Sequence, residues 1–67
     1  MSVTVNGKPA TLPDHARSLD ELLAHLALPL DRVAVELNGR LIRRGDRSQT
    51  AVRDGDILEV VTLVGGG

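Results

Sequence analysis

The sequence contains no cysteine, so a disulfide framework and a thiolate metal site are both excluded. It also contains no phenylalanine, tyrosine or tryptophan. Because single-stranded nucleic acid is usually held by bases stacked on aromatic rings, this absence argues against that class of ligand. The formal net charge of −1 provides no general attraction for phosphate groups, and we expect no nucleic-acid partner.

Long hydrophobic runs are also absent. No apolar stretch approaches the roughly 20 residues that span a bilayer, and the opening MSVTVNGKPA does not resemble a signal peptide. We therefore expect no membrane partner and a cytoplasmic location. A single domain of this size buries only about 60% of its unfolded surface, so its stability should be marginal. Its core must come from the 21 Leu, Val and Ile residues, with some Ala.

The first part of the chain has the pattern of a β-hairpin. Residues 2–6 alternate polar and apolar, as a half-buried strand does. Asn6-Gly7 then favours a type I′ turn, in which both central residues need positive φ. Residues 8–12 form the predicted return strand, and Pro9 indicates an edge position because proline cannot donate to a sheet.

One amphipathic helix follows. Ser18 and Glu21 have capping-box spacing, so each side chain can accept from the other residue's backbone N–H. Leucines recur after Ser18 at helical spacing and form one apolar stripe: Leu19, Leu22, Leu23 and Leu26. We predict a helix of about ten residues that ends at Pro29.

The second half of the chain predicts another hairpin and a long final strand. The alternating strand 33–37 ends at Asn38-Gly39, and a short charged return strand covers 40–43. The stretch RGDRSQTA is expected to be a loop, and Asp54-Gly55-Asp56 a tight turn. Residues 57–64 are the longest β-branched run and suit a central strand.

This order of elements predicts an α+β, β-grasp (ubiquitin-like) fold. A mixed sheet of four to five strands carries one helix on one face, and its first and last strands lie side by side in the middle. We expect residues 1–64 to form the domain and residues 65–67 to be a flexible glycine tail.

The final strand should have two different faces. Leu58, Val60, Thr62 and Val64 point one way, and Ile57, Glu59, Val61 and Leu63 point the other. An unpaired carboxylate beneath the helix would cost several kcal/mol, so the face with Glu59 should be open. Val61 and Leu63 would then form an exposed apolar patch beside the tail. Isolated surface apolar residues are common, but this position makes Glu59, Val61 and Leu63 candidates for partner docking.

Arginines are concentrated in the later part of the chain. Five of the eight positively charged residues lie there: Arg40, Arg43, Arg44, Arg47 and Arg53. A solvated face that protects a sheet edge is one interpretation. The other is a basic patch that steers an acidic partner surface, for which Arg43 and Arg44 are the candidates.

No constellation of side chains in the sequence predicts catalysis. The serines have no plausible His and Asp partners, and His15 and His25 are expected to be solvated surface residues. Two histidines without a third placed ligand do not indicate a metal site. We therefore expect a substrate protein and not an enzyme, with no bound cofactor or metal of its own.

Three stretches together resemble the ThiS sulfur-carrier family of thiamine biosynthesis. They are VAVELNG at 33–39, DGD at 54–56 and VTLVGGG at 61–67, in a chain whose length and element order also match. The stretch RLIRRGDRSQT at 40–50 departs from the family, because many members have a Pro-Arg and an aromatic residue there.

The resemblance implies a function for the tail. An E1-like, ThiF-type enzyme would use ATP to adenylate the carboxylate of Gly67, and a cysteine desulfurase or another persulfide donor would supply sulfur. The product would be a thiocarboxylate on Gly67, whose sulfur a ThiG-type thiazole synthase takes. Gly65 and Gly66 would form the arm that reaches into the partner's site.

The chemistry itself also favours such a tail. A carboxylate becomes a good electrophile only with a good leaving group, and glycine backbone can enter a channel that side chains would block. Three glycines reach at most about 10 Å. Open alternatives are a carrier for molybdopterin or another metabolite, a ubiquitin-like protein modifier, and a plain interaction module with an idle tail.

Overall fold

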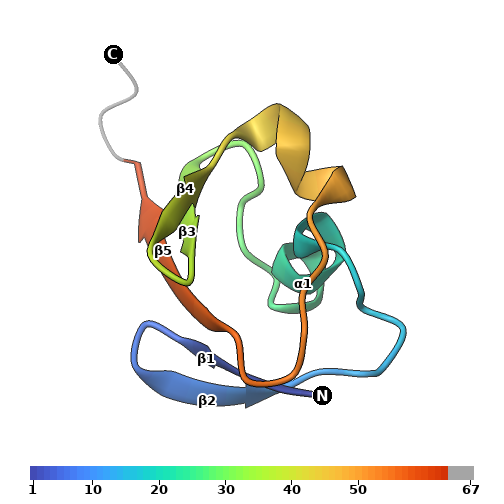
Figure 1. The fold of residues 1–67 in the computed structure, drawn as a ribbon. Helices are drawn as coiled ribbons and strands as arrows, with labels where there is room; N and C mark the ends of the chain where they lie inside the picture. The colour runs from blue at the N-terminus through green and yellow to red at the C-terminus, as the bar shows by residue number, and fades with distance from the viewer. Residues whose placement is uncertain (64–67) are drawn as a thin grey trace.

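The computed structural model describes residues 1–63, which form a five-stranded mixed sheet and one α-helix (Figure 1). The chain runs through β1 (Ser2–Val5), β2 (Lys8–Thr11), α1 (Leu19–His25), β3 (Val33–Leu37), β4 (Arg40–Ile42), the 3₁₀ helix η1 (Arg44–Gln49) and β5 (Ile57–Thr62). The strand order is β2-β1-β5-β3-β4, with β1 and β5 parallel and every other pair antiparallel. The predicted β-grasp fold is confirmed.

Both Asn-Gly pairs form hairpin turns. Asn6 and Asn38 each have a φ of 51°, and the glycines that follow have φ values of 80° and 83°. These positive values are what a type I′ turn requires at its two central residues. The strand β2 lies at one edge of the sheet, as Pro9 predicts, and β4 lies at the other edge.

Helix α1 starts as predicted but is shorter than expected. Both capping-box hydrogen bonds between Ser18 and Glu21 are present. The helix ends at His25, not at Pro29, because Ala27 adopts a φ of 57° and the Leu28 N–H donates to the carbonyl of Leu23. This is the Schellman arrangement, in which a left-handed residue closes the helix.

The expectation of a loop over RGDRSQTA is wrong for its first six residues, which form η1. The turns of η1 are closed by backbone bonds from Asp46 N–H to the Arg43 carbonyl and from Thr50 N–H to the Arg47 carbonyl. The sequence does not predict this helix because the stretch has no apolar pattern, and its buried side chain is a charged one, Arg47. The ends of β1, β2, β3 and β4 lie within one residue of the predicted ends. The sequence predicts that the final strand reaches Val64, but β5 ends at Thr62, and Val64 lies outside the described residues.

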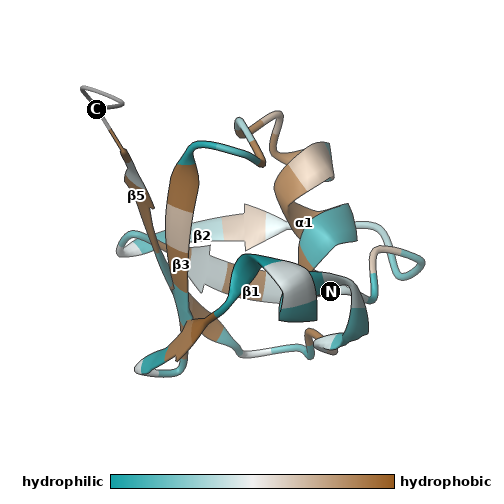
Figure 2. Cartoon of the chain, turned by 90° about the horizontal axis from the view of Figure 1, so that it is seen from above, coloured by the Kyte–Doolittle hydropathy of each residue, from teal (hydrophilic) through white to brown (hydrophobic). Residues whose placement is uncertain are grey.

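The core lies between α1 and one face of the sheet. The leucine stripe of the helix packs on apolar residues of β1, β3 and β5, and Figure 2 shows α1 to one side of the hydrophobic β3 and β5. The side chains with the least exposure are Leu19, Leu22, Leu23, Leu58, Val3 and Val35. Burying each of them contributes about 1.5–3 kcal/mol, which explains how a chain without aromatic residues can fold. Within residues 1–63 no helix has the length and apolar character needed to cross a bilayer.

Candidate functional site

The strand β5 occupies the centre of the sheet and leads towards the predicted glycine tail (Figure 1). It pairs with β1 at Thr4 and Val5 on one side and with the whole of β3 on the other. Gly65, Gly66 and Gly67 lie outside the described residues, so the predicted arm and sulfur-carrying residue stay predictions. The last described residue, Leu63, donates its N–H to the carbonyl of Arg32 at 2.6 Å.

The side chain of Asn6 fixes β5 in a way that the turn motif did not predict. Its Nδ2 donates to the carbonyl of Val60 at 3.0 Å, and its Oδ1 accepts from the N–H of Val60 at 2.7 Å. The register pairs of β1 with β5 end at Val5 and Leu58. The amide of Asn6 therefore extends this contact by imitating a peptide group of a paired strand.

The beginning of β5 is fixed by the second Asn-Gly turn and the Asp-Gly-Asp turn. The N–H of Ile57 donates to Asn38 Oδ1 at 2.9 Å, and Asn38 Nδ2 donates to Asp56 Oδ1 at 3.0 Å. Asp54 Oδ1 accepts from the N–H of Ser2 at 2.6 Å, and Asp56 Oδ2 accepts from the N–H of Arg53. These carboxylates serve turn chemistry, as predicted, and they also tie β5 to its neighbouring strands.

The sheet face opposite α1 carries an exposed apolar patch. Val61 is 60% exposed and Leu63 is 58% exposed, while Leu58 and Val60 point into the core. The predicted division of β5 into two faces is thus confirmed from Ile57 to Val61, whereas Thr62 is exposed and Val64 lies outside the described residues. A docking role for Val61 and Leu63 stays a prediction. Leu41 of the edge strand β4 is 69% exposed and adds apolar surface.

Two carboxylates lie directly opposite each other on this open face. Glu59 of β5 is the register partner of Glu36 of β3, which in turn is the register partner of Leu41. Both glutamates are exposed, and neither has an ion-pair partner among the described residues. Like charges directly opposite each other destabilise an antiparallel pair. The open face therefore combines apolar contact area with a local negative charge that has no partner within the described part of the chain.

The arginines do not form one solvated face. Arg40, Arg43, Arg44 and Arg53 are exposed, but the expectation for Arg47 is wrong, because it is only 3% exposed. Arg47 turns inward because its guanidinium binds two backbone carbonyls, that of Leu30 in the connection between α1 and β3 and that of Val33 at the start of β3. The candidate basic patch keeps Arg43 and Arg44, which follow β4 directly.

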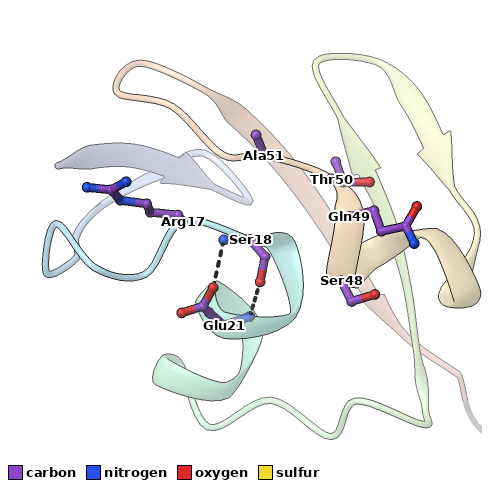
Figure 3. A pocket seen from close by; sticks show the side chains of 7 residues that line it. All are labelled: Arg17, Ser18, Glu21, Ser48, Gln49, Thr50 and Ala51. Atoms are coloured by element: carbon purple, nitrogen blue, oxygen red, sulfur yellow. Dashed lines mark hydrogen bonds between the residues drawn. The ribbon is translucent and has the colours of Figure 1, made fainter.

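A small open pocket of about 210 Å³ lies between the start of α1 and the end of η1 (Figure 3). Two of its polar side chains are already used by the fold, since Ser18 and Glu21 bind each other's backbone N–H at 3.2 Å. Ser18 also forms an isolated bridge with Ala51 across the pocket. His15 and His25 are exposed, and the part of the chain that the structure describes contains no group of three or more potential metal ligands.

A β-grasp domain with an open apolar face and a central last strand is of the ubiquitin-like class. Residues 3–67 match the ThiS family. The chain belongs to the ThiS family, the family of sulfur carriers of thiamine biosynthesis that the sequence resemblance indicated. This membership agrees with the prediction that the chain is not an enzyme.

Two proteins of known name are similar to this chain in sequence. It is 37% identical over 65 residues to the sulfur carrier protein ThiS of Thermus thermophilus, covering 97% of this chain and 98% of that protein. It is also 34% identical over 67 residues to a thiazole synthase of Paramagnetospirillum magneticum. That match covers the whole of this chain but spans only 20% of the length of the thiazole synthase.

Solved structures confirm the fold. The crystal structure of the thiamine biosynthesis protein ThiS from Geobacter metallireducens has a TM-score of 0.85 and 40% identity, with all of both chains covered. A complex of subunits 1 and 2 of molybdopterin-converting factor from Helicobacter pylori gives a TM-score of 0.62 and 28% identity, again with all of both chains covered.

Proposed function

We propose that the protein carries sulfur as a thiocarboxylate on Gly67 and donates it for synthesis of the thiazole ring of thiamine. The observation that carries the proposal is the match to the ThiS family, which extends to residue 67 and therefore includes all three terminal glycines. The exposed patch and the hydrogen-bonded β5 support it, because they would provide a docking face next to Leu63.

The proposed reaction begins at another protein's nucleotide site. The Gly67 carboxylate attacks the α-phosphate of ATP, pyrophosphate leaves, and an acyl-adenylate forms in the E1-like, ThiF-type enzyme. The outer sulfur of a persulfide then displaces AMP, and a thiol reduces the resulting acyl disulfide to the thiocarboxylate. ATP belongs to the activating enzyme, so the carrier itself needs no cofactor. We place this chemistry in the cytoplasm, which contains both ATP and reduced sulfur donors.

Thiazole synthase is the proposed acceptor of the sulfur. A thiazole synthase that contains a stretch similar to this whole chain supports this partner. On the carrier side, Val61, Leu63 and Glu59 are the proposed contacts of the open face. A partner surface that fits them would present apolar groups around a basic side chain, because Glu36 and Glu59 concentrate negative charge there. Arg43 and Arg44 would instead face an acidic surface of the activating enzyme.

Intact mass tests the proposed function. The protein is incubated with ATP, a ThiF-type enzyme and a persulfide donor, and we expect a mass gain equal to the exchange of one oxygen for sulfur. A variant lacking Gly66 and Gly67 should stay unmodified and yet keep its melting temperature, because terminal glycines bury little surface. An unmodified wild-type protein would refute the proposal. Covalent attachment to other proteins would instead identify a modifier.

The second candidate function is delivery of sulfur to molybdopterin. The fold shared with the molybdopterin-converting factor complex favours it, although the identity of 28% is lower than the 40% found with the ThiS structure. The thiocarboxylate form of the carrier separates the two functions when it is offered to thiazole synthase and, separately, to the large subunit of molybdopterin synthase. Loss of sulfur only to the second enzyme would overturn the thiamine assignment.

A further inference from the structure

Arg47 is a buried cation held by backbone alone. Its Nη1 donates to the carbonyl of Leu30 at 3.0 Å, and its Nη2 donates to the carbonyl of Val33 at 2.6 Å. Within residues 1–63 it has no carboxylate partner, and its Nε is buried without a hydrogen-bond acceptor. Burying a guanidinium that has no carboxylate partner costs free energy, and its two bonds to backbone carbonyls offset part of that cost. The two carbonyls therefore indicate what the arginine is for.

The two carbonyls show what the guanidinium holds. Strand β4 pairs with β3 no further than Val35, so it leaves the carbonyl of Val33 without a partner in β4. Arg47 supplies the missing donor. Its planar fork can reach two carbonyls at once in a fixed geometry, which a lysine ammonium cannot reproduce. The result is that residues 30–33, which are the end of the connection between α1 and β3 and the first residue of β3, are fixed to η1.

This segment holds the point at which the chain leaves the sheet. Between the two carbonyls bound by Arg47 lies Arg32, whose own carbonyl accepts from the N–H of Leu63 at 2.6 Å. Val33 is also the register partner of Thr62, the last residue of β5. We call residues 30–33 together with Leu63 the tail root. A continuous set of contacts thus runs from Arg47 through the tail root to the residues that precede the glycines.

We infer that Arg47 is a positioning residue for the reaction at the tail: it fixes the position of Leu63, the last described residue before the tail. The structural part of this inference, that Arg47 fixes the tail root, does not depend on the proposed function. Its consequence for the adenylation step rests on the proposed function. Leu63 belongs both to the proposed docking face and to the tail root, so a fixed root keeps the start of the tail at one place relative to the docked surface. Because small misplacements can reduce a rate by about 10²-fold, freeing the root should lower turnover of the adenylation step.

Hydrogen exchange on the free protein tests the structural part. In the wild type, the Leu63 amide should exchange much more slowly than it would in an unfolded peptide. In Arg47→Met and Arg47→Lys, its protection relative to the Val60 amide, which donates to Asn6, should fall by about tenfold or more as the root opens locally. Val3→Ala is the matched control, because Val3 is a buried core residue of β1 that has no place in the tail root. It should lower protection at both amides equally.

Two outcomes would overturn the inference. The first is an unprotected Leu63 amide in the wild type, a measurement that requires no variant and so stands even if Arg47→Met fails to fold. The second is that Arg47→Lys, like Val3→Ala, lowers the protection of the Leu63 amide and of the Val60 amide by the same factor. Either would reduce Arg47 to a residue with a merely structural role.

Activation kinetics test the consequence. With a ThiF-type enzyme and ATP–pyrophosphate exchange as the readout, Arg47→Lys should lower kcat about tenfold or more, with KM for the carrier nearly unchanged. Val3→Ala, assayed well below its melting temperature, should match the wild type. Equal loss in both variants, or a change confined to KM, would overturn the consequence. If the wild type is never activated, the proposed function fails, while the hydrogen-exchange result still decides whether Arg47 holds the root.

Discussion

The two Asn-Gly turns offer a matched test of how β5 is held in place. Asn6 and Asn38 have the same φ of 51°, so replacing either by glycine preserves the turn. Asn6 binds both backbone groups of Val60, which is only 8% exposed, whereas the side-chain bonds of Asn38 are exposed to solvent. Asn6→Gly should therefore cost much more stability than Asn38→Gly.

The size of the difference follows from the contacts. A net hydrogen bond contributes about 0.5–1.5 kcal/mol, and a buried group left without a partner costs about 1–3 kcal/mol. Losing both bonds to Val60 should thus cost about 2 kcal/mol, equivalent to a fall in melting temperature of roughly 8–16 °C for a domain of this size. Water can replace the bonds of Asn38, so Asn38→Gly should cost at most about 1 kcal/mol.

Urea unfolding followed by far-ultraviolet circular dichroism measures both values, since the chain has no aromatic residue to serve as a fluorescent probe. The midpoints should separate while the denaturant slopes stay equal, which indicates a change in stability alone. Equal costs for the two variants, or a cost below about 0.5 kcal/mol for Asn6→Gly, would refute the claim that the Asn6 amide acts as an extra strand residue.

Three further changes test other features. Ala27→Gly should stabilise the protein by about 0.5–1 kcal/mol in thermal unfolding, because glycine adopts the left-handed conformation at the helix end without strain; a lower melting temperature would contradict this. Glu59→Gln should raise stability by about 0.2–1 kcal/mol at low salt by removing repulsion from Glu36, and an effect independent of salt would rule out that cause. Charge reversal at Arg43 and Arg44 should slow association with the activating enzyme and weaken its salt dependence in stopped-flow measurements, and unchanged rates would exclude steering.

Local sequence patterns were sufficient to predict most elements of this fold. The alternation in 2–6 and 33–37, the capping box at Ser18 and the long run after Asp56 each encode their structure over a few residues. The open face could also be predicted, because Glu59 alternates with buried neighbours along one strand. These features depend only on side-chain period and turn chemistry.

The features that the sequence did not reveal depend on partners far along the chain. The Asn6 side chain binds Val60, 54 residues away, and nothing near Asn6 distinguishes it from an ordinary turn residue. Arg47 lies in a polar stretch that predicts a solvated loop, and only the two carbonyls of another segment draw it inward. Ala27 ends the helix before Pro29 although alanine is the residue that most favours continuation.

The central place of β5 also has a consequence for synthesis of the protein. A ribosome releases β1 and β2 first, yet the strand that joins them to β3 and β4 is the last of the five strands to emerge. A nascent chain therefore has two separate hairpins with no common sheet until β5 has been translated. Products of premature termination should lack a docking face altogether, and a partner that recognises this face would select for chains whose translation had reached the final strand.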